Sequence, residues 1–260
     1  MKLITSLAAA AAMLTASVAG AQAAQISALW GDNSISIVDT DGWKVVKTWK
    51  IDGVTGSVVG IDVRPADGML YGLVADGTVV TIDTSTGKAT MKSKLETMLP
   101  AGTMATVDFN PAADRLRVIG SDGTSLRANV DDGKVTKDGS LKYADTDANK
   151  GKTPKVIAGA YSNSVKGTKE TTLFDIDATT GSLVRQAPPN DGILNTIGEL
   201  GVKGDTWSFD IWSDGTKNEA WLLGGTTVYK VDLASGKATE AGKITGAQGA
   251  VRDMAILPGM

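Results

Sequence analysis

The chain has 260 residues, with 26 lysines and arginines against 29 aspartates and glutamates, and it contains neither cysteine nor histidine. This composition excludes disulfides, Ser-His-Asp and Cys-His catalysis, histidine-based zinc sites and histidine proton shuttles. The charges are scattered and form no basic stripe, which argues against nucleic acid as a partner. Any chemistry therefore depends on Asp, Glu, Lys, Arg, Tyr or Ser, or on a hard metal ion held by oxygen atoms.

The first 23 residues have the pattern of a secretory signal peptide. Lys2 gives a positive start, residues 3–19 are mostly Ala, Leu, Met and Val, and residues 21–23 (Ala-Gln-Ala) fit a small-x-small cleavage site. We therefore expect one mature domain over residues 24–260, in the periplasm or secreted. The apolar run is too short to persist as a membrane span and no later run is longer, so we expect no membrane insertion.

Turn signals and short strand-like runs alternate through the rest of the chain. Asp76-Gly77 and Asp122-Gly123 mark turns, and β-branched runs such as 78–82 (TVVTI) and 226–231 (TTVYKV) lie between such turns. Runs spaced by roughly 8–12 residues are typical of an all-β sandwich, barrel or propeller. Residues 91–99 have weak helical character, but a strand followed by a loop suits them equally well.

A longer repeat distinguishes between these folds. A strand-like phrase, usually with a polar centre, recurs five times: 60–65 (GIDVRP), 106–111 (TVDFNP), 158–163 (AGAYSN), 208–212 (SFDIW) and 252–258 (RDMAILP). The phrases lie roughly 43–51 residues apart, which is the period of a four-stranded propeller blade. Three further strand-like runs follow the first phrase: 69–74, 78–83 and 88–91.

The fifth phrase has no strands after it, whereas the N-terminal region has three strand-like runs without a first strand: 26–30, 34–38 and 44–51. A blade built from both termini closes the ring and protects the sheet edges. We therefore predict a five-bladed β-propeller of four-stranded blades, with the last blade closed by N- and C-terminal strands. The alternative is a long β-sandwich.

Several phrases carry a family resemblance: 108–118 (DFNPAADRLRV), 126–130 (LRANV), 160–164 (AYSNS), 186–192 (QAPPNDG) and 198–202 (GELGV). Together they resemble the bacterial domain-of-unknown-function family numbered 4394, over about residues 59–257. The resemblance implies an exported, propeller-like protein and no particular activity. Ser162 stands where the family pattern leads us to expect threonine, and it keeps the hydroxyl group.

Four aspartates occupy the same place in four of the five phrases: Asp62, Asp108, Asp210 and Asp253. In a propeller the first strand of each blade lines the central channel, so these carboxylates are candidate ligands for a cation such as calcium, or candidate groups for glycoside hydrolysis. The competing interpretation is structural. A repeated aspartate can accept hydrogen bonds from backbone N–H groups once per blade, and catalysis needs an asymmetry between acid and base that repetition does not provide.

Polar side chains crowd the second phrase and the strands after it: Asn110, Arg115, Arg117 and Arg127. Alternation sends Arg115 and Arg117 to the same face of their strand. Two guanidinium groups there fit a carboxylate or phosphate ligand. They also fit an internal lattice of ion pairs with Asp108 and Asp114, which we favour.

The segment 145–151 begins like a calcium-binding loop, with Asp145, Asp147 and Asn149 at alternate positions. It departs from that pattern further on, because Lys150 stands at the sixth position in place of glycine and Val156 at the twelfth in place of glutamate. We regard a solvated polar loop as the alternative to a calcium site.

Two prolines in 186–192 fix a rigid turn that stands clear of the sheet. Tyr161, Asn163, Gln186 and Asn190 are then candidates for a polar, uncharged ligand-binding ring at one end of the channel, with a plain connecting turn as the alternative.

These features favour an exported, monomeric, non-enzymatic propeller that binds a small molecule or a protein partner. No organic cofactor is implied, and calcium is the candidate ion. The alternatives are a carboxylate-based hydrolase of carbohydrates or lactones, and a structural module of the cell envelope.

Overall fold

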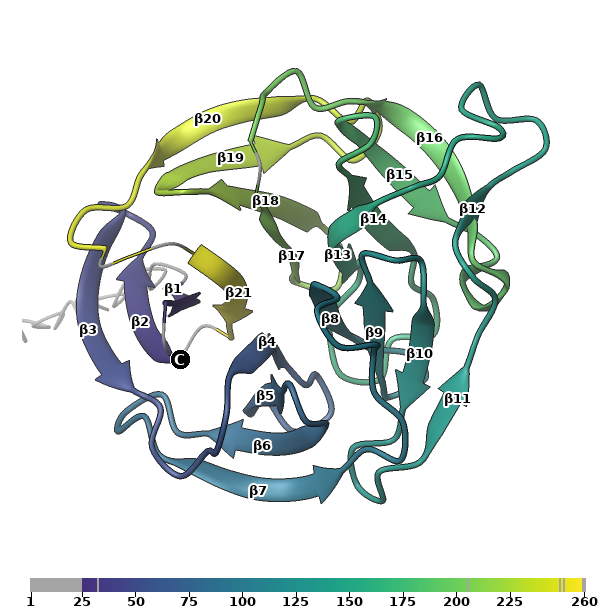
Figure 1. The fold of residues 1–260 in the computed structure, drawn as a ribbon. Helices are drawn as coiled ribbons and strands as arrows, with labels where there is room; N and C mark the ends of the chain where they lie inside the picture. Colours follow the sequence, from purple (N-terminus) through teal and green to yellow (C-terminus); the bar gives the residue numbers. More distant parts are fainter. Residues whose placement is uncertain (1–24, 32, 205, 248, 250, 259–260) are drawn as a thin grey trace, which may run out of the picture.

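The computed structural model describes residues 25–31, 33–204, 206–247, 249 and 251–258. These residues form five separate sheets arranged as a ring (Figure 1). The predicted all-β five-bladed propeller is confirmed. The expected signal peptide, residues 1–23, lies outside the described residues. Among those that are described, no helix has the length and apolar character needed to cross a membrane.

Blade I is built from both ends of the described chain. From centre to rim its strands are β21 (Val251–Leu257), β1 (Gln25–Trp30), β2 (Ser34–Asp39) and β3 (Lys44–Lys50). β21 runs antiparallel to β1, with Ala255 opposite Ser27. The predicted closure of the ring is therefore present, and the free edges of an open sheet array are avoided.

Blades II and III follow in sequence, each with its first strand at the centre. Blade II consists of β4 (Val58–Val63), β5 (Leu70–Val74), β6 (Thr78–Ile82) and β7 (Ala89–Lys94). Blade III consists of β8 (Ala105–Asn110), β9 (Arg115–Gly120), β10 (Ser125–Ala128) and β11 (Val135–Lys137). Residues 91–94 belong to strand β7 and a loop follows, so the weak helical pattern there does not produce a helix.

Blade IV has one strand more than the others. It consists of β13 (Val156–Tyr161), β14 (Leu173–Asp177), β15 (Ser182–Gln186), β16 (Ile193–Glu199) and the short β12 (Lys142–Tyr143), which pairs in parallel with β16. A single 3-10 turn, η1 (Pro189–Asp191), precedes β16. Blade V consists of β17 (Ser208–Ser213), β18 (Asn218–Gly224), β19 (Thr227–Val231) and β20 (Ala238–Lys243).

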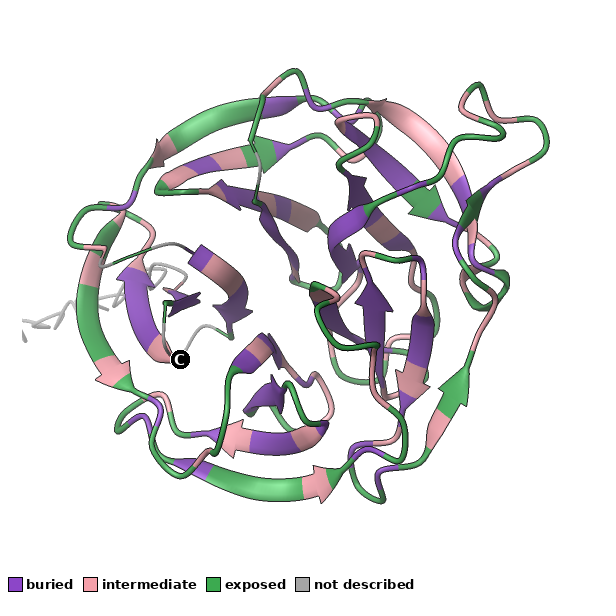
Figure 2. Ribbon diagram, viewed as in Figure 1, coloured by how far each residue is buried: buried purple, intermediate pink, exposed green. Residues whose placement is uncertain are grey.

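The apolar core is divided among the junctions between blades. Within the described part of the chain, each of the five pairs of neighbouring blades encloses one cluster of buried hydrophobic side chains. Strand alternation produces this division, because successive side chains of a strand face opposite sides. On β1, for example, Leu29 packs toward blade II and Ala28 toward blade V. Burial accordingly decreases from the central strands to the outer strands (Figure 2).

Tight turns connect many of the neighbouring strands within the blades. At Asp76-Gly77, the glycine has a φ of +88°, and the aspartate side chain accepts the backbone N–H of Thr78 at 2.9 Å. Glycine adopts this conformation without strain, and aspartate commonly bonds the backbone two residues ahead. The Asp-Gly dipeptide therefore fixes the hairpin between β5 and β6.

Candidate functional site

Four of the five inner strands carry an aspartate that reaches across to the next blade: Asp62 on β4, Asp108 on β8, Asp210 on β17 and Asp253 on β21. The carboxylate of Asp62 accepts the backbone N–H of Val63 at 2.7 Å and that of Phe109, in blade III, at 2.6 Å. An inner strand has a sheet neighbour on one side only, so its other N–H groups need partners. The aspartates supply those partners.

The remaining three aspartates make the same kind of bond, always toward the following blade. Asp108 accepts the N–H of Tyr161 at 2.9 Å, and Asp210 accepts that of Ile256 at 2.6 Å. Asp253 accepts the N–H of Ile61 at 2.9 Å. Backbone hydrogen bonds of this kind are what the structural interpretation of the repeated aspartate expects. The N–H groups that the aspartates accept lie on the inner strand of the next blade and not in a turn.

The four carboxyl groups also form a concentration of buried negative charge. Burial, and after it repulsion from Asp210, raises the pKa of Asp62 well above its usual value. Burial, and after it repulsion from Asp62, does the same to the pKa of Asp108. Burial raises the pKa of Asp210 to about 6 and that of Asp253 to about 7. Among the ion pairs of the described residues, none includes any of these four groups.

Three of the carboxylates are close enough to share a cation. One oxygen each from Asp62, Asp108 and Asp210 lies within 4.8 Å of the other two. Carboxylate oxygens are the ligands that calcium prefers, so these residues are the ones that would hold such an ion. The backbone bonds described above already use one lone pair on most of these oxygens, and a metal ion would share them.

A pocket opens at the end of the channel where the inner strands terminate. Its volume is about 310 Å³, within the range of small-molecule sites. Asp62 and Asp210 contribute to its lining, together with Trp212, Ile256 and Lys166. The pocket therefore combines two buried carboxyl groups, an aromatic ring, apolar side chains and one lysine.

The loop between β13 and β14 contributes to this pocket from blade IV. Ser164, Val165 and Lys166 belong to this loop and line the pocket. Two hydrogen bonds between Asn163 and Asn218 hold this loop to blade V. The backbone N–H of Asn163 donates to the side-chain oxygen of Asn218 at 2.7 Å, and the side-chain amide of Asn218 donates back at 2.9 Å.

Comparison with known proteins assigns the chain to a family. The family model "Domain of unknown function (DUF4394)" matches residues 34–255, which is most of the chain. The chain belongs to the DUF4394 family. The DUF4394 chain is also similar to the crystal structure of a structural genomics protein of unknown function from Bacteroides thetaiotaomicron, with a TM-score of 0.55 and 15% sequence identity over 93% of this chain and 68% of that one. At that identity the likeness shows the fold alone. Curated proteins give no match.

Blade IV of this DUF4394 propeller lacks an aspartate at the ring position, where Ala160 stands, but it buries a different one. Asp175 on β14 is 0% exposed and lies opposite Gly159 of the inner strand. Neither of its carboxyl oxygens has a hydrogen-bond partner among the described residues. Burial raises its pKa to about 8. A Cβ atom on Gly159 would overlap the carboxyl group, so the glycine makes room for it. The sequence pattern did not predict this residue.

The DUF4394 arginines form ion pairs, but with other partners than the sequence suggested. Arg117 is 1% exposed and, together with Arg127, binds Asp138, which lies beyond β11. Arg115 donates to the backbone carbonyl oxygen of Asp114 at 2.8 Å. The expected lattice with Asp108 and Asp114 is therefore replaced by one centred on Asp138. Because Asp138 binds the guanidinium groups of both Arg117 and Arg127, these two arginines do not present a vacant anion site.

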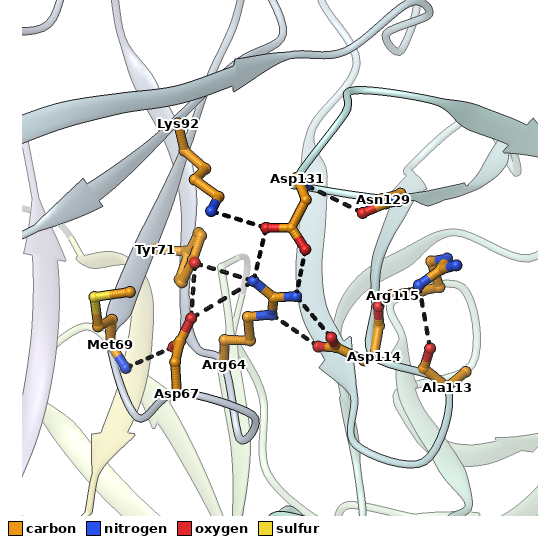
Figure 3. A network of polar contacts seen from close by, with 10 residues as sticks. All are labelled: Arg64, Asp67, Met69, Tyr71, Lys92, Ala113, Asp114, Arg115, Asn129 and Asp131. Carbon is orange, nitrogen blue, oxygen red and sulfur yellow. Dashed lines mark hydrogen bonds and ion pairs between the residues drawn. The ribbon is translucent and has the colours of Figure 1, made fainter.

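Asp114 is instead bound by an arginine of the preceding blade. Figure 3 shows Arg64 between two carboxylates, with Nη2 at 2.6 Å from Asp114 and 2.9 Å from Asp131. The same guanidinium donates to the Tyr71 hydroxyl at 3.2 Å, and Lys92 approaches Asp131 to 2.8 Å. The network ties blade II to blade III.

Asn110 caps its own turn, because its side-chain oxygen accepts the backbone N–H groups of Ala112 at 3.0 Å and Ala113 at 2.9 Å. Its side chain therefore serves the local backbone.

The expected polar ring is gathered only in part. Tyr161 and Asn190 both contact Arg117, at 3.2 and 2.9 Å, and Gln186 donates to the backbone of Pro189 beside them. Asn163 instead fastens the loop at the pocket. Tyr161, Gln186 and Asn190 therefore lie at the junction of blades III and IV and do not line the pocket.

The residues of the candidate calcium loop face different partners. The side chain of Asp145 is 91% exposed and pairs with Lys150 at 3.0 Å. Asp147 accepts the backbone N–H of Thr196 at 2.6 Å, and Asn149 donates to the Thr196 hydroxyl at 3.0 Å. The polar side chains of this segment thus anchor it to β16 of the DUF4394 propeller.

Proposed function

We propose that this DUF4394 propeller is an exported, non-catalytic binding protein that holds a small ligand in the pocket at one end of its channel. The observation that supports this is the pocket of about 310 Å³ in which carboxyl groups, an indole ring and apolar side chains converge. Sites of this size with a few polar groups in an apolar lining are typical of small-molecule binding. The signal-peptide pattern of residues 1–23 supports export. The protein would act as a monomer, without nucleic acid or membrane insertion.

The arrangement of the carboxyl groups supports binding rather than hydrolysis. A carboxylate pair in a glycosidase needs one group kept as the acid and one kept ionised. Here burial raises the pKa of all four ring aspartates, and each is bound to backbone N–H groups.

A carbohydrate or lactone hydrolase remains the second candidate, because the pKa values of Asp210 and Asp253, at about 6 and about 7, suit a general acid at neutral pH. Release of nitrophenol from aryl glycosides, or acid from lactones, that is lost in the Asp210→Asn variant would favour it over our proposal.

The binding proposal is tested by blocking the pocket. Ser164 lines it and is only partly buried, so Ser164→Trp should fill the cavity without disturbing the blades. Ser235→Trp, in an exposed turn between β19 and β20, is the matched control. We expect a library of small polar and aromatic compounds, screened by ligand-observed NMR, to contain binders that Ser164→Trp abolishes and Ser235→Trp retains. If the two variants bind the same compounds as the parent, the pocket is not the site.

A further inference from the structure

The charges at the pocket indicate what kind of ligand it takes. Asp62 and Asp210 form part of its lining, each no more than 7% exposed, and one carboxyl oxygen of Asp108 lies within 4.8 Å of an oxygen of each. None of the three has a basic side chain as an ion-pair partner among the residues that the structure describes. Without a cation partner, burial raises the pKa values of Asp62 and Asp210 and favours their protonated forms. A cation that enters the pocket would favour the ionised forms, so the site suits a positively charged ligand.

Asp108 brings a third carboxyl group to the same place. One of its carboxyl oxygens accepts the N–H of Tyr161 at 2.9 Å, and the residue is 5% exposed. One oxygen of Asp108 lies within 4.8 Å of an oxygen of Asp62 and of an oxygen of Asp210. A positively charged donor that enters from the pocket would therefore meet several carboxyl oxygens close together.

The rest of the lining determines whether the cation is inorganic or organic. Trp212, Val63, Ile211 and Ile256 surround the carboxyl groups with apolar and aromatic surface. A metal ion leaves such surface bare, whereas an organic ammonium covers it, and the face of an indole attracts a cationic nitrogen. A pocket of about 310 Å³ also exceeds what a single ion needs.

We infer that the ligand of this pocket is a small organic molecule with a positively charged nitrogen, whose ammonium group faces Asp62 and Asp210 and whose apolar part lies against Trp212. This inference rests on the proposed function, because it specifies the chemistry of the same pocket. Lys166, the one basic residue among the described pocket-lining residues, then lies at the exposed rim and opposes the binding of a simple cation.

The test compares three ligands of one shape and different charge. Benzylamine, benzyl alcohol and benzoate are titrated into the full-length mature protein, with binding followed by calorimetry and by tryptophan fluorescence. We expect benzylamine to bind with a Kd of about 1 mM, the range for a fragment of this size. Benzyl alcohol should bind about tenfold more weakly, since the difference between a charged and a neutral hydrogen bond is worth about that factor.

Two variants should change the affinity for benzylamine in opposite directions. Asp210→Asn should weaken benzylamine about tenfold and leave benzyl alcohol unchanged, because the carboxylate acts on the charge. Lys166→Glu changes an exposed side chain and carries little risk to folding. It should strengthen benzylamine several-fold and weaken benzoate, since the nearby charge is reversed. If Asp210→Asn fails to fold, the effect of Lys166→Glu on the binding of benzylamine and benzoate alone shows which ligand charge the pocket prefers.

The outcomes distinguish a failure of the cationic ligand from a failure of the pocket as a binding site. If benzoate or benzyl alcohol binds as tightly as benzylamine and Ser164→Trp abolishes that binding, the cationic ligand is refuted and the pocket stands. If none of the three binds at about 10 mM, ten times the expected Kd, both are refuted. If calcium chloride raises the melting temperature and prevents benzylamine from binding, the organic cation is refuted and the ligand of the pocket is a metal ion.

Discussion

The buried carboxyl group of Asp175 makes the stability of this propeller depend on pH in a way that a single substitution should remove. Its folded pKa is about 8, against an ordinary value of 3.8. A carboxyl group whose folded pKa exceeds its unfolded pKa costs nothing below pH 4 and destabilises the fold increasingly as pH rises toward 8. At 1.36 kcal/mol per pH unit, the cost of keeping it protonated grows by about 4 kcal/mol between pH 4 and pH 7.

Asparagine has nearly the shape of the protonated carboxyl group and stays neutral at every pH. Asp175→Asn should therefore leave the free energy of unfolding nearly unchanged at pH 4 and raise it by about 4 kcal/mol at pH 7. With a urea m-value of about 2 kcal/mol/M, the unfolding midpoint at pH 7 moves up by about 2 M. Subtraction of the parent curve cancels the titration of the four ring aspartates, provided that they do not respond to the substitution.

The measurement is urea unfolding, followed by tryptophan fluorescence, of parent and variant at both pH values. Asp145→Asn is the control, because that side chain is 91% exposed and should show no comparable dependence. An Asp175→Asn effect of the same size at pH 4 and pH 7 would refute the reasoning. It would show that the carboxylate is ionised in the fold, with its charge balanced by Arg117, whose guanidinium lowers this pKa.

Three further predictions concern the contacts that hold the ring together. Asp62→Ala leaves the buried N–H of Phe109 without its acceptor and should lower the free energy of unfolding by about 2 kcal/mol, as measured with urea at pH 4, where the raised pKa of Asp62 carries no cost; an unchanged midpoint would contradict the structural role of the ring. Arg64→Ala leaves two facing carboxylates without their shared cation and should cost about 2 kcal/mol, less in 1 M salt than in low salt; a loss independent of salt would point to packing alone. Deletion of residues 255–260 removes the last three of the seven residues of β21 and should abolish a cooperative melting transition followed by circular dichroism, whereas melting within a few degrees of the parent would show that the ring does not depend on this strand.

The blades were predictable from the sequence because each is specified locally. Turn dipeptides such as Asp76-Gly77 occur where the backbone needs a positive φ, and the strands between them alternate faces over short distances. The closure of blade I followed from counting strands, since β1 to β3 lacked an inner partner that β21 supplies. Neither inference needed knowledge of contacts between blades.

The partners of the buried polar side chains were less predictable, because they depend on how strands and sheets twist and pack. Asp138 lies after β11, and neither its position nor its spacing shows that it meets Arg117 on β9 of the same blade. Asp175 was missed because the search followed the first strand of each blade, whereas blade IV places its buried carboxyl group on the second strand. The one available signal was Gly159, a residue without a side chain in an otherwise apolar strand.

The composition of blade I has a consequence for the order of events during biosynthesis. β1, β2 and β3 are made first, yet the strand that completes their sheet follows every other blade in the chain. During synthesis the inner edge of β1 therefore stays unpaired until β21, more than two hundred residues later in the chain, has been made. Such an edge is a template for pairing with other chains. A chaperone that covers β1 until β21 arrives would be of more use to this protein than to a propeller whose blades each close in sequence.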